Sequence, residues 1–297
     1  MRRPMIAIAL ILVLGGCAQE TDPSYIAQVN QWHAGRITRL KAEDGWLTLV
    51  GLHPLQEGAN TVGSAGDRQV QLVEKAPAQL GVITVSSERI LFAAHPGVPV
   101  TVAGAPEAEP VVSTTLQTDR SGRPTVLEAG SLRMHVIDRD GLLFLRVKDR
   151  QAETLLEFHG VMRFPVSDRW RVAARLEDGP ATMAVPNVLG QTSQVPSPGV
   201  LVFKLAGKEC RLTAQGEKGQ GLFIVFGDGT NGKTTYGGGR FLSTEEAQPD
   251  GTYILDFNLA TNPPCVFTPY ATCPLPSLDN ILPVAVAAGE RMWGEQH

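Results

Sequence analysis

SLRMHVIDRDGLLFLRVKD, residues 131–149, is the stretch that decides the fold class of this 297-residue chain. Apolar and polar residues alternate on both sides of Asp138-Arg139-Asp140-Gly141, a pattern typical of two antiparallel strands joined by a tight turn. The stretch GVLVFKLAGKECRLTAQGEKGQGLFIVF, residues 199–226, repeats the alternation with longer connections that contain glycine. Hairpins of this kind predict antiparallel sheets.

The same pattern extends over most of the chain. From Trp46 onward, short runs rich in Val, Ile, Leu and Thr are separated by Gly, Pro and Asp. No helical insert of ten to fifteen residues interrupts them, which argues against a doubly wound fold. The sequence therefore predicts a mainly β protein with antiparallel sandwich or barrel-like sheets.

One amphipathic helix is expected before the strands, over residues 23–44. Asp22 can cap it and Pro23 suits its first turn. Apolar residues and one histidine follow at helical spacing, namely Ile26, Val29, His33, Ile37 and Leu40. The polar run RQAETLLE, residues 150–157, then divides an N-terminal β region, 45–150, from a C-terminal β region, 151–297. A chain of this length is compatible with one domain or two.

The first residues read MRRPMIAIALILVLGGC, which predicts a signal peptide over 1–16 because the apolar run is too short to span a bilayer. Leu14-Gly15-Gly16-Cys17 resembles the lipobox of bacterial lipoproteins, in which the cysteine is lipidated. Residues 17–22 would be the lipidated tether. The expected location is the cell envelope, anchored through Cys17, and Ala18 after the cysteine favours the outer membrane, facing the periplasm.

Charge and ligand patterns exclude several function classes. Lys and Arg number 26 against 30 Asp and Glu, so the net charge of −4 argues against nucleic-acid binding. The six histidines are scattered, and the chain has no H-E-x-x-H, C-x-x-C or EF-hand pattern. We therefore predict no metal and no cofactor; the expected partners are the membrane, through the lipid, and a small-molecule ligand.

A glycine-rich segment, GDGTNGKT at residues 227–234, matches the spacing of phosphate-binding loops. Such loops need a helix to follow, because the phosphate sits on the free N–H groups at its start. Here TYGGGRF, residues 235–241, follows, with three consecutive glycines that disfavour a helix. The segment is predicted to be a turn between two strands.

Three cysteines follow Cys17, at positions 210, 265 and 273. In an exported protein disulfides persist, and the nearest pair closes a short loop. We predict a Cys265–Cys273 disulfide and a buried thiol at Cys210, with other pairings open.

A polar site is expected in the C-terminal β region. In TYILDFNLA, residues 252–260, the alternation places Asp256 and Asn258 together on one face of a strand. If EEAQPDG, residues 245–251, joins an antiparallel pair, Arg240 stands opposite Asp256. The pair is then either a structural ion pair or an anion clamp with Asp256 as orienter or general base.

Six prolines stiffen residues 261–283, which we expect to form a rigid lid or a pocket wall at that site. The predicted ligand-binding residues are Tyr236, Arg240, Asp256, Asn258, Asn262 and Asn280. The first hypothesis is an envelope protein that binds a small or anionic ligand there. The alternatives are a hydrolase with Asp256 or Glu290 as general base and Arg240 as anion stabiliser, and a scaffold with no pocket.

The chain also resembles an uncharacterised bacterial family, domain of unknown function 1684. The resemblance is carried by DGWLTLVGLHPLQEGANTVG, LRVKD, FHGVMRFP, FGDGTNGKTTYGGGRFL, LDFNLATNPPCVFTPYATCPLPSLDNIL and AAGE. It implies that Tyr236, Arg240, Asp256, Asn258, Asn262, Cys265, Cys273, Asn280 and Glu290 belong to the family signature. It implies no activity, so no catalytic role is transferred.

Overall fold

The computed structural model describes residues 20–105 and 109–294. The predicted signal peptide, 1–16, the predicted lipidation site Cys17 and residues 18 and 19 of the predicted tether lie outside the described residues. Within them, no helix combines the length and the apolar character needed to cross a bilayer.

The predicted N-terminal helix is present as α1, Pro23–Leu40. Asp22 caps it as expected: its Oδ1 accepts a hydrogen bond from the Ser24 N–H at 2.8 Å. The helix ends at Leu40 rather than at residue 44, because the chain folds back against its last turn. A Cβ atom at Gly45 would lie 2.3 Å from the Leu40 carbonyl oxygen, so this close approach requires glycine.

The N-terminal β region contains two five-stranded sheets packed face to face, in the orders β1-β10-β9-β8-β6 and β3-β2-β4-β5-β7. Their strands are β1 Leu49–Pro54, β2 Gly58–Gly63, β3 Val70–Gln71, β4 Gly81–Val85, β5 Ile90–Ala94, β6 Thr101–Val102, β7 Ser113–Thr115, β8 Leu127–Ala129, β9 Leu132–Arg139 and β10 Leu142–Asp149. Buried side chains from both sheets, among them Phe92 and Met134, form one core.

The hairpin predicted from residues 131–149 is confirmed. β9 and β10 pair antiparallel from Leu132 opposite Asp149 to Arg139 opposite Leu142. Asp140 and Gly141 form the turn between them, with φ angles of 53° and 86°. A two-residue turn with positive φ at both positions matches the twist of the strands it joins.

The C-terminal β region has a four-stranded sheet, β15-β14-β11-β18, and two two-stranded sheets, β12-β13 and β16-β17. The elements are α2 Glu153–Leu156, β11 Arg171–Glu177, β12 Thr182–Pro186, β13 Thr192–Pro196, β14 Gly199–Leu205, β15 Lys208–Ala214, β16 Phe223–Phe226, β17 Arg240–Ser243 and β18 Tyr253–Asp256. A second core lies here and includes Phe203, Phe226 and Phe257.

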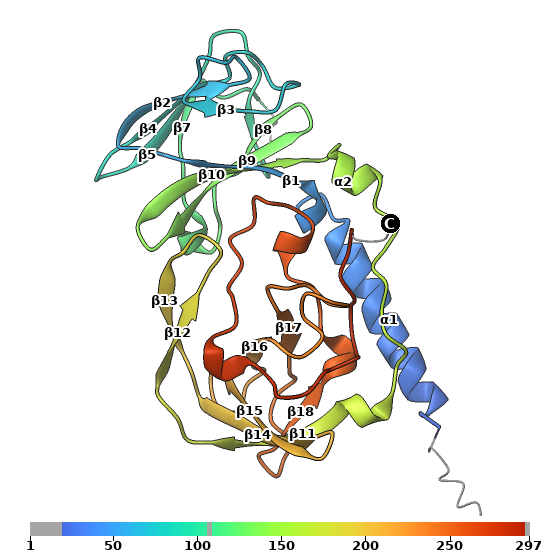
Figure 1. The fold of residues 1–297 in the computed structure, drawn as a ribbon. Helices are drawn as coiled ribbons and strands as arrows, with labels where there is room; N and C mark the ends of the chain where they lie inside the picture. Colours follow the sequence, from blue (N-terminus) through green and yellow to red (C-terminus); the bar gives the residue numbers. More distant parts are fainter. Residues whose placement is uncertain (1–19, 106–108, 295–297) are drawn as a thin grey trace, which may run out of the picture.

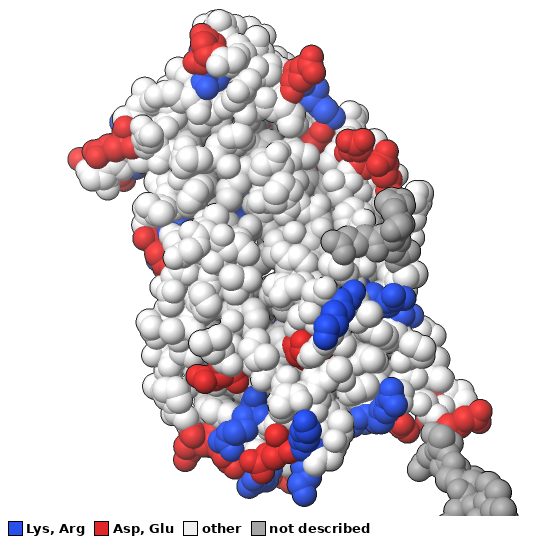
Figure 2. All heavy atoms as spheres, viewed as in Figure 1, with Lys and Arg blue, Asp and Glu red and all other residues white. Residues whose placement is uncertain are grey.

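The predicted fold class is therefore confirmed: the protein is mainly β, and its strand pairs are antiparallel apart from the short pair of β2 with β3. In the part of the chain that the structure describes, no sheet closes into a barrel. Figure 1 shows α1 along one side of the molecule, from the level of β11 and β18 to that of β1. Figure 2 shows Lys, Arg, Asp and Glu intermixed at the ends of this face and mostly uncharged residues across its middle.

Candidate functional site

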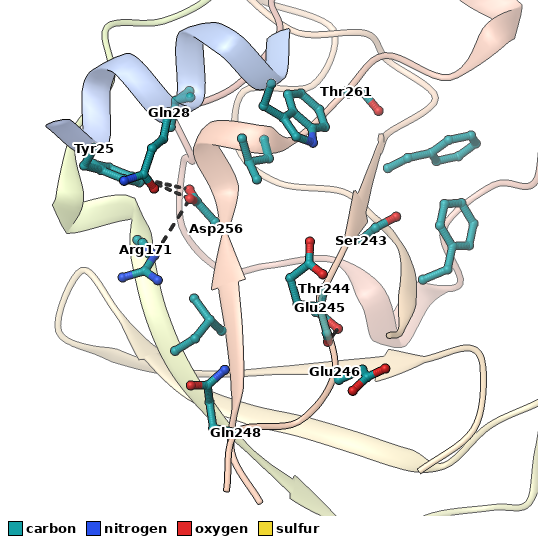
Figure 3. Close-up of a pocket in the computed structure, with 16 residues that line it drawn as sticks. Tyr25, Gln28, Arg171, Ser243, Thr244, Glu245, Glu246, Gln248, Asp256 and Thr261 are labelled. Atoms are coloured by element: carbon teal, nitrogen blue, oxygen red, sulfur yellow. Dashed lines mark hydrogen bonds and ion pairs between the residues drawn. The ribbon is translucent and has the colours of Figure 1, made fainter. Parts of the chain in front are cut away.

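A cavity of about 440 Å³ lies between α1 and the strands of the C-terminal region. Figure 3 shows α1 above it, with β18 and the segment after β17 below. The lining residues are Tyr25, Gln28, Val29, Trp32, Arg171, Phe223, Phe241, Ser243, Thr244, Glu245, Glu246, Gln248, Ile254, Asp256, Leu259 and Thr261. Its volume falls in the range of small-molecule sites, about 300–1,000 Å³.

The lining combines apolar and polar side chains. Trp32, Phe223 and Phe241 provide aromatic surface, and smaller apolar side chains lie between them. Among the lining residues, the acidic groups are Glu245, Glu246 and Asp256, whereas the basic group is Arg171. Excess negative charge at the cavity favours a cationic or an uncharged ligand over an anion.

Asp256 lies where α1 meets β18. Its two carboxylate oxygens both lie 2.8 Å from the Tyr25 hydroxyl and share its single proton, and Oδ1 also accepts from the Asn258 N–H at 3.0 Å. The Arg171 Nε lies 4.0 Å from Oδ2 (Figure 3). Burial, and then the hydrogen bond to Asp256, raise the pKa of Tyr25, so its hydroxyl remains a donor at neutral pH. Asp256 thus helps to fix α1 over the cavity.

A second polar contact holds α1 further along its length. The Arg36 Nη2 donates to the Asn262 carbonyl oxygen at 3.1 Å, and its Nε lies 3.4 Å from Oε1 of Glu290. The other carboxylate oxygen of Glu290 accepts from the Asn262 N–H at 2.7 Å. Burial raises the pKa of Glu290, and the nearby Arg36 opposes that shift. Glu290 is 1% exposed and does not line the cavity.

The predicted pairing of Arg240 with Asp256 is wrong. β17 pairs with β16, which places Arg240 opposite Phe226, and β18 pairs with β11, which places Asp256 opposite Arg171. The glycine-rich segment 227–239 is the connection between β16 and β17, with no helix in it, as predicted. Because this turn joins β16 directly to β17, it supplies a local partner for β17 before β18 is reached.

Arg240 is fully buried and bound to the protein itself. Its Nη2 donates to Asp228 Oδ2 at 2.6 Å and to the Val286 carbonyl oxygen at 2.9 Å, and its Nη1 donates to the Ala288 carbonyl oxygen. Both side chains of the ion pair are 0% exposed. These contacts match the structural interpretation of Arg240, with Asp228 in place of Asp256, and Arg240 is not among the residues that line the cavity.

The six predicted ligand-binding residues do not converge on one cavity. Asp256 lines it, whereas Asn258, Asn262 and Asn280 are buried and donate side-chain N–H groups to backbone carbonyls at 2.9, 2.7 and 2.9 Å. Tyr236 lies beside Cys265 instead. The proline-rich segment supplies Thr261 to the cavity wall and no other lining residue. Its Phe267, Ala271 and Cys273 pack against residues 40–49 instead, so the segment is not a lid over this cavity.

The predicted Cys265–Cys273 disulfide is absent, because both cysteines are free thiols, as is the buried Cys210. The two residues are nevertheless neighbours: the Cys265 N–H donates to Cys273 Sγ at 3.1 Å. The two side chains also share a hydrogen bond, so they lie together as free thiols. Among residues 20–105 and 109–294, no group of three or more His, Cys, Asp or Glu is arranged to hold a metal ion.

The sequence interpretation missed the contribution of α1 to the cavity. Tyr25, Gln28, Val29 and Trp32 recur at intervals of three and four along the helix and therefore share one face. The apolar face predicted from the sequence, which begins at Ile26, shares only Val29 with the face that lines the cavity. The aromatic residues at the two ends of this face, Tyr25 and Trp32, were the sequence feature that could have indicated it.

His33, on α1, makes the folding stability of the protein depend on pH. Burial, followed by the charges of Arg163 and Arg36, lowers the pKa of His33 to about 4 from an unfolded value of 6.5. The neutral imidazole therefore stabilises the fold above pH 6.5, and this contribution is lost as the pH falls from 6.5 towards 4. We expect His33→Gln to reduce that loss by roughly 2 kcal/mol in urea unfolding measured across this pH window. The same change at the exposed His95 should leave the profile as it is, and equal profiles for both variants would contradict the assignment.

The described geometry defines a mainly β protein with a helix-walled cavity in its C-terminal region. The profile of the family described as "Protein of unknown function (DUF1684)" matches residues 156–291, so this part of the chain belongs to that family. The chain is also similar to an uncharacterized protein of Haloarcula marismortui known from a solution NMR structure, at 32% sequence identity over 47% of this chain and 80% of that chain, with a TM-score of 0.40. No curated protein matches the chain.

Proposed function

We propose that this protein is a lipid-anchored envelope protein that binds a small amphipathic ligand in the cavity under α1. The observation that supports the proposal is the cavity itself, about 440 Å³, whose lining contains both aromatic and acidic residues. Pockets of this composition bury the apolar body of a ligand and orient it with a few polar groups. The anchor rests on the sequence of residues 1–17, and loss of fatty-acid labelling in Cys17→Ser is the expected result that checks it.

The charge of the lining selects the ligand class. The guanidinium expected to bind an anion, that of Arg240, is occupied by Asp228, and Arg171 lies beside Asp256. Glu245 and Glu246 are exposed at the cavity and carry no ion pair within the described residues. We therefore propose a ligand with an apolar body and a cationic group, in place of an anionic one.

The hydrolase alternative has less support. Asp256 is bound by Tyr25 and Asn258, and Glu290 is buried, bound by Asn262 and Arg36, and away from the cavity. A general base needs an accessible oxygen for the proton it takes.

Calorimetric titration with octylamine and octanoate tests the binding proposal. The protein is the full chain with Cys17→Ser, which removes the lipidation site without altering a described residue. We expect octylammonium to bind at least about tenfold more tightly than octanoate, because the same apolar tail then meets an acidic lining. Glu245→Gln with Glu246→Gln should remove that preference, whereas Glu209→Gln, an exposed change outside the cavity, should retain it.

Filling the cavity provides the second arm of the test. Ile254 lines the cavity from β18, so Ile254→Trp should abolish binding of both compounds while the far-ultraviolet circular dichroism spectrum is unchanged. Equal binding by the parent protein and Ile254→Trp, or tighter binding of octanoate, would refute the proposed site.

A further inference from the structure

A pair of thiols lies outside the cavity, in the proline-rich segment of the family signature. The Cys265 N–H donates to Cys273 Sγ at 3.1 Å, and neither residue lines the ligand cavity. Cys265 is partly exposed, whereas Cys273 is 3% exposed. One accessible thiol with a second, buried thiol against it is the arrangement that thiol–disulfide exchange needs, because the first sulfur reacts with an external group and the second displaces it.

The surroundings of the pair favour ionisation of the accessible thiol. A hydrogen bond from the Cys273 thiol lowers the pKa of Cys265; burial opposes the shift, and a hydrogen bond with the Tyr236 hydroxyl adds to it. The same thiol–thiol hydrogen bond, together with burial, raises the pKa of Cys273. Burial and the neighbouring Cys265 raise the pKa of Tyr236 to about 12, so its hydroxyl remains protonated and can donate. The thiolate is the reactive form of cysteine.

The buried thiol also has a positive charge nearby. The Arg146 guanidinium acts on Cys273 in the direction that favours its thiolate. The Arg146 Nη2 lies 3.4 Å from the hydroxyl oxygen of Thr272, the residue before Cys273, and the guanidinium stacks on Trp46 at 5.4 Å from the ring centroid. Arg146 is therefore fixed where it can stabilise Cys273 as that thiol loses its proton.

We propose that Cys265 and Cys273 form a redox-active dithiol that exchanges with an external disulfide, Cys265 being the attacking residue and Cys273 the resolving one. The Cys265 thiolate attacks one sulfur of the external disulfide; that S–S bond breaks, a mixed disulfide forms and one thiolate leaves. Cys273 then gives its proton to solvent and attacks the Cys265 sulfur, releasing the second thiolate. The protein loses two electrons and two protons, and the external disulfide becomes two thiols.

The position of the pair gives the exchange a structural effect. Cys273 packs in one apolar cluster with Leu49 of β1 and Ala271, and Phe241 of β17 and Cys265 lie against it. Residues of the N-terminal sandwich and of the C-terminal region therefore meet at these sulfurs. A disulfide between Cys265 and Cys273 would draw their two sulfurs together and so change the packing against Leu49 and Phe241.

Oxidised glutathione is the probe that tests the proposal, with the full chain carrying Cys17→Ser, reduced and freed of reductant. We expect intact-protein mass spectrometry to show loss of two hydrogens and no lasting glutathione adduct. Cys273→Ser should stop at a glutathione adduct on Cys265, because the resolving thiol is missing. Cys265→Ser should react at least about tenfold more slowly, since the remaining described thiols, Cys210 and Cys273, are buried. The matched control Cys210→Ser, which removes the other buried thiol, should behave as the parent protein.

Tyr236→Phe separates a reactive pair from a merely structural one. Loss of the hydroxyl should move the pH profile of the exchange rate to higher pH, because the Cys265 thiolate loses a hydrogen-bond donor. The proposal is overturned if Cys265 reacts no faster than Cys210 in the native protein, if Cys273→Ser traps no adduct, or if the pair is found bonded and resists dithiothreitol under native conditions.

Discussion

Asp228→Asn is expected to lower the free energy of unfolding by about 3–5 kcal/mol, because it removes one charge of a fully buried ion pair and leaves the other without compensation. Arg240 and Asp228 are both 0% exposed, with 2.6 Å between Nη2 and Oδ2. The same carboxylate also accepts hydrogen bonds from the Thr230 N–H at 2.8 Å and the Val286 N–H at 3.1 Å. Asparagine retains the shape of the side chain but not the negative charge.

The measurement is urea unfolding followed by circular dichroism. Glu177→Gln is the matched control, because Glu177 pairs with Arg211 at 2.8 Å with side chains 36% and 51% exposed. Such surface pairs contribute about 0–1 kcal/mol. Adding Arg240→Met to Asp228→Asn should destabilise less than the sum of the single changes, since no buried charge then remains. Similar small losses for Asp228→Asn and Glu177→Gln would show that the pair does not stabilise this fold.

Phe257→Ala is expected to lower the free energy of unfolding by about 3–5 kcal/mol through the cavity that it leaves in the C-terminal core. Phe257 is fully buried, and its ring centroid lies 5.9 Å from that of Phe203 and 5.4 Å from that of Phe226. These neighbours come from β14 and β16, so one ring connects separate sheets.

Comparison with two other variants isolates the packing contribution. Phe257→Leu retains most of the volume and should lose less than Phe257→Ala. Leu278→Ala changes a side chain that is 93% exposed and should remain within about 0.5 kcal/mol of the parent protein. A loss below about 1 kcal/mol for Phe257→Ala would mean that the surrounding rings close the cavity completely.

The features that the sequence predicted correctly are local ones. Alternation over residues 131–149 and a turn that accepts positive φ determine a hairpin without reference to distant residues. The capping of α1 by Asp22 is equally local, since the hydrogen bond spans two residues. Both predictions were confirmed because their energies depend on neighbours in the chain.

The predictions that failed depend on choices between distant partners. Arg240 can lie opposite Asp256 only if β17 pairs with β18, and the turn after β16 gives β17 a different neighbour. Asn262 and Asn280 are of a residue type that often binds ligands. Here their side-chain amides donate hydrogen bonds to backbone carbonyl oxygens instead. Residue type alone does not distinguish these two uses of an amide. The wall supplied by Tyr25 was missed for the same reason, since its partner Asp256 is 231 residues away.

The buried ion pair is completed by a part of the chain that is made later. Its backbone partners at Val286 and Ala288 lie 46 and 48 residues beyond Arg240. During translation, strands β16 and β17 therefore leave the ribosome with a guanidinium and a carboxylate that still lack these partners. A polypeptide that ends before residue 286 would lack both carbonyl partners of Arg240, and we expect it to be degraded more readily than the full chain.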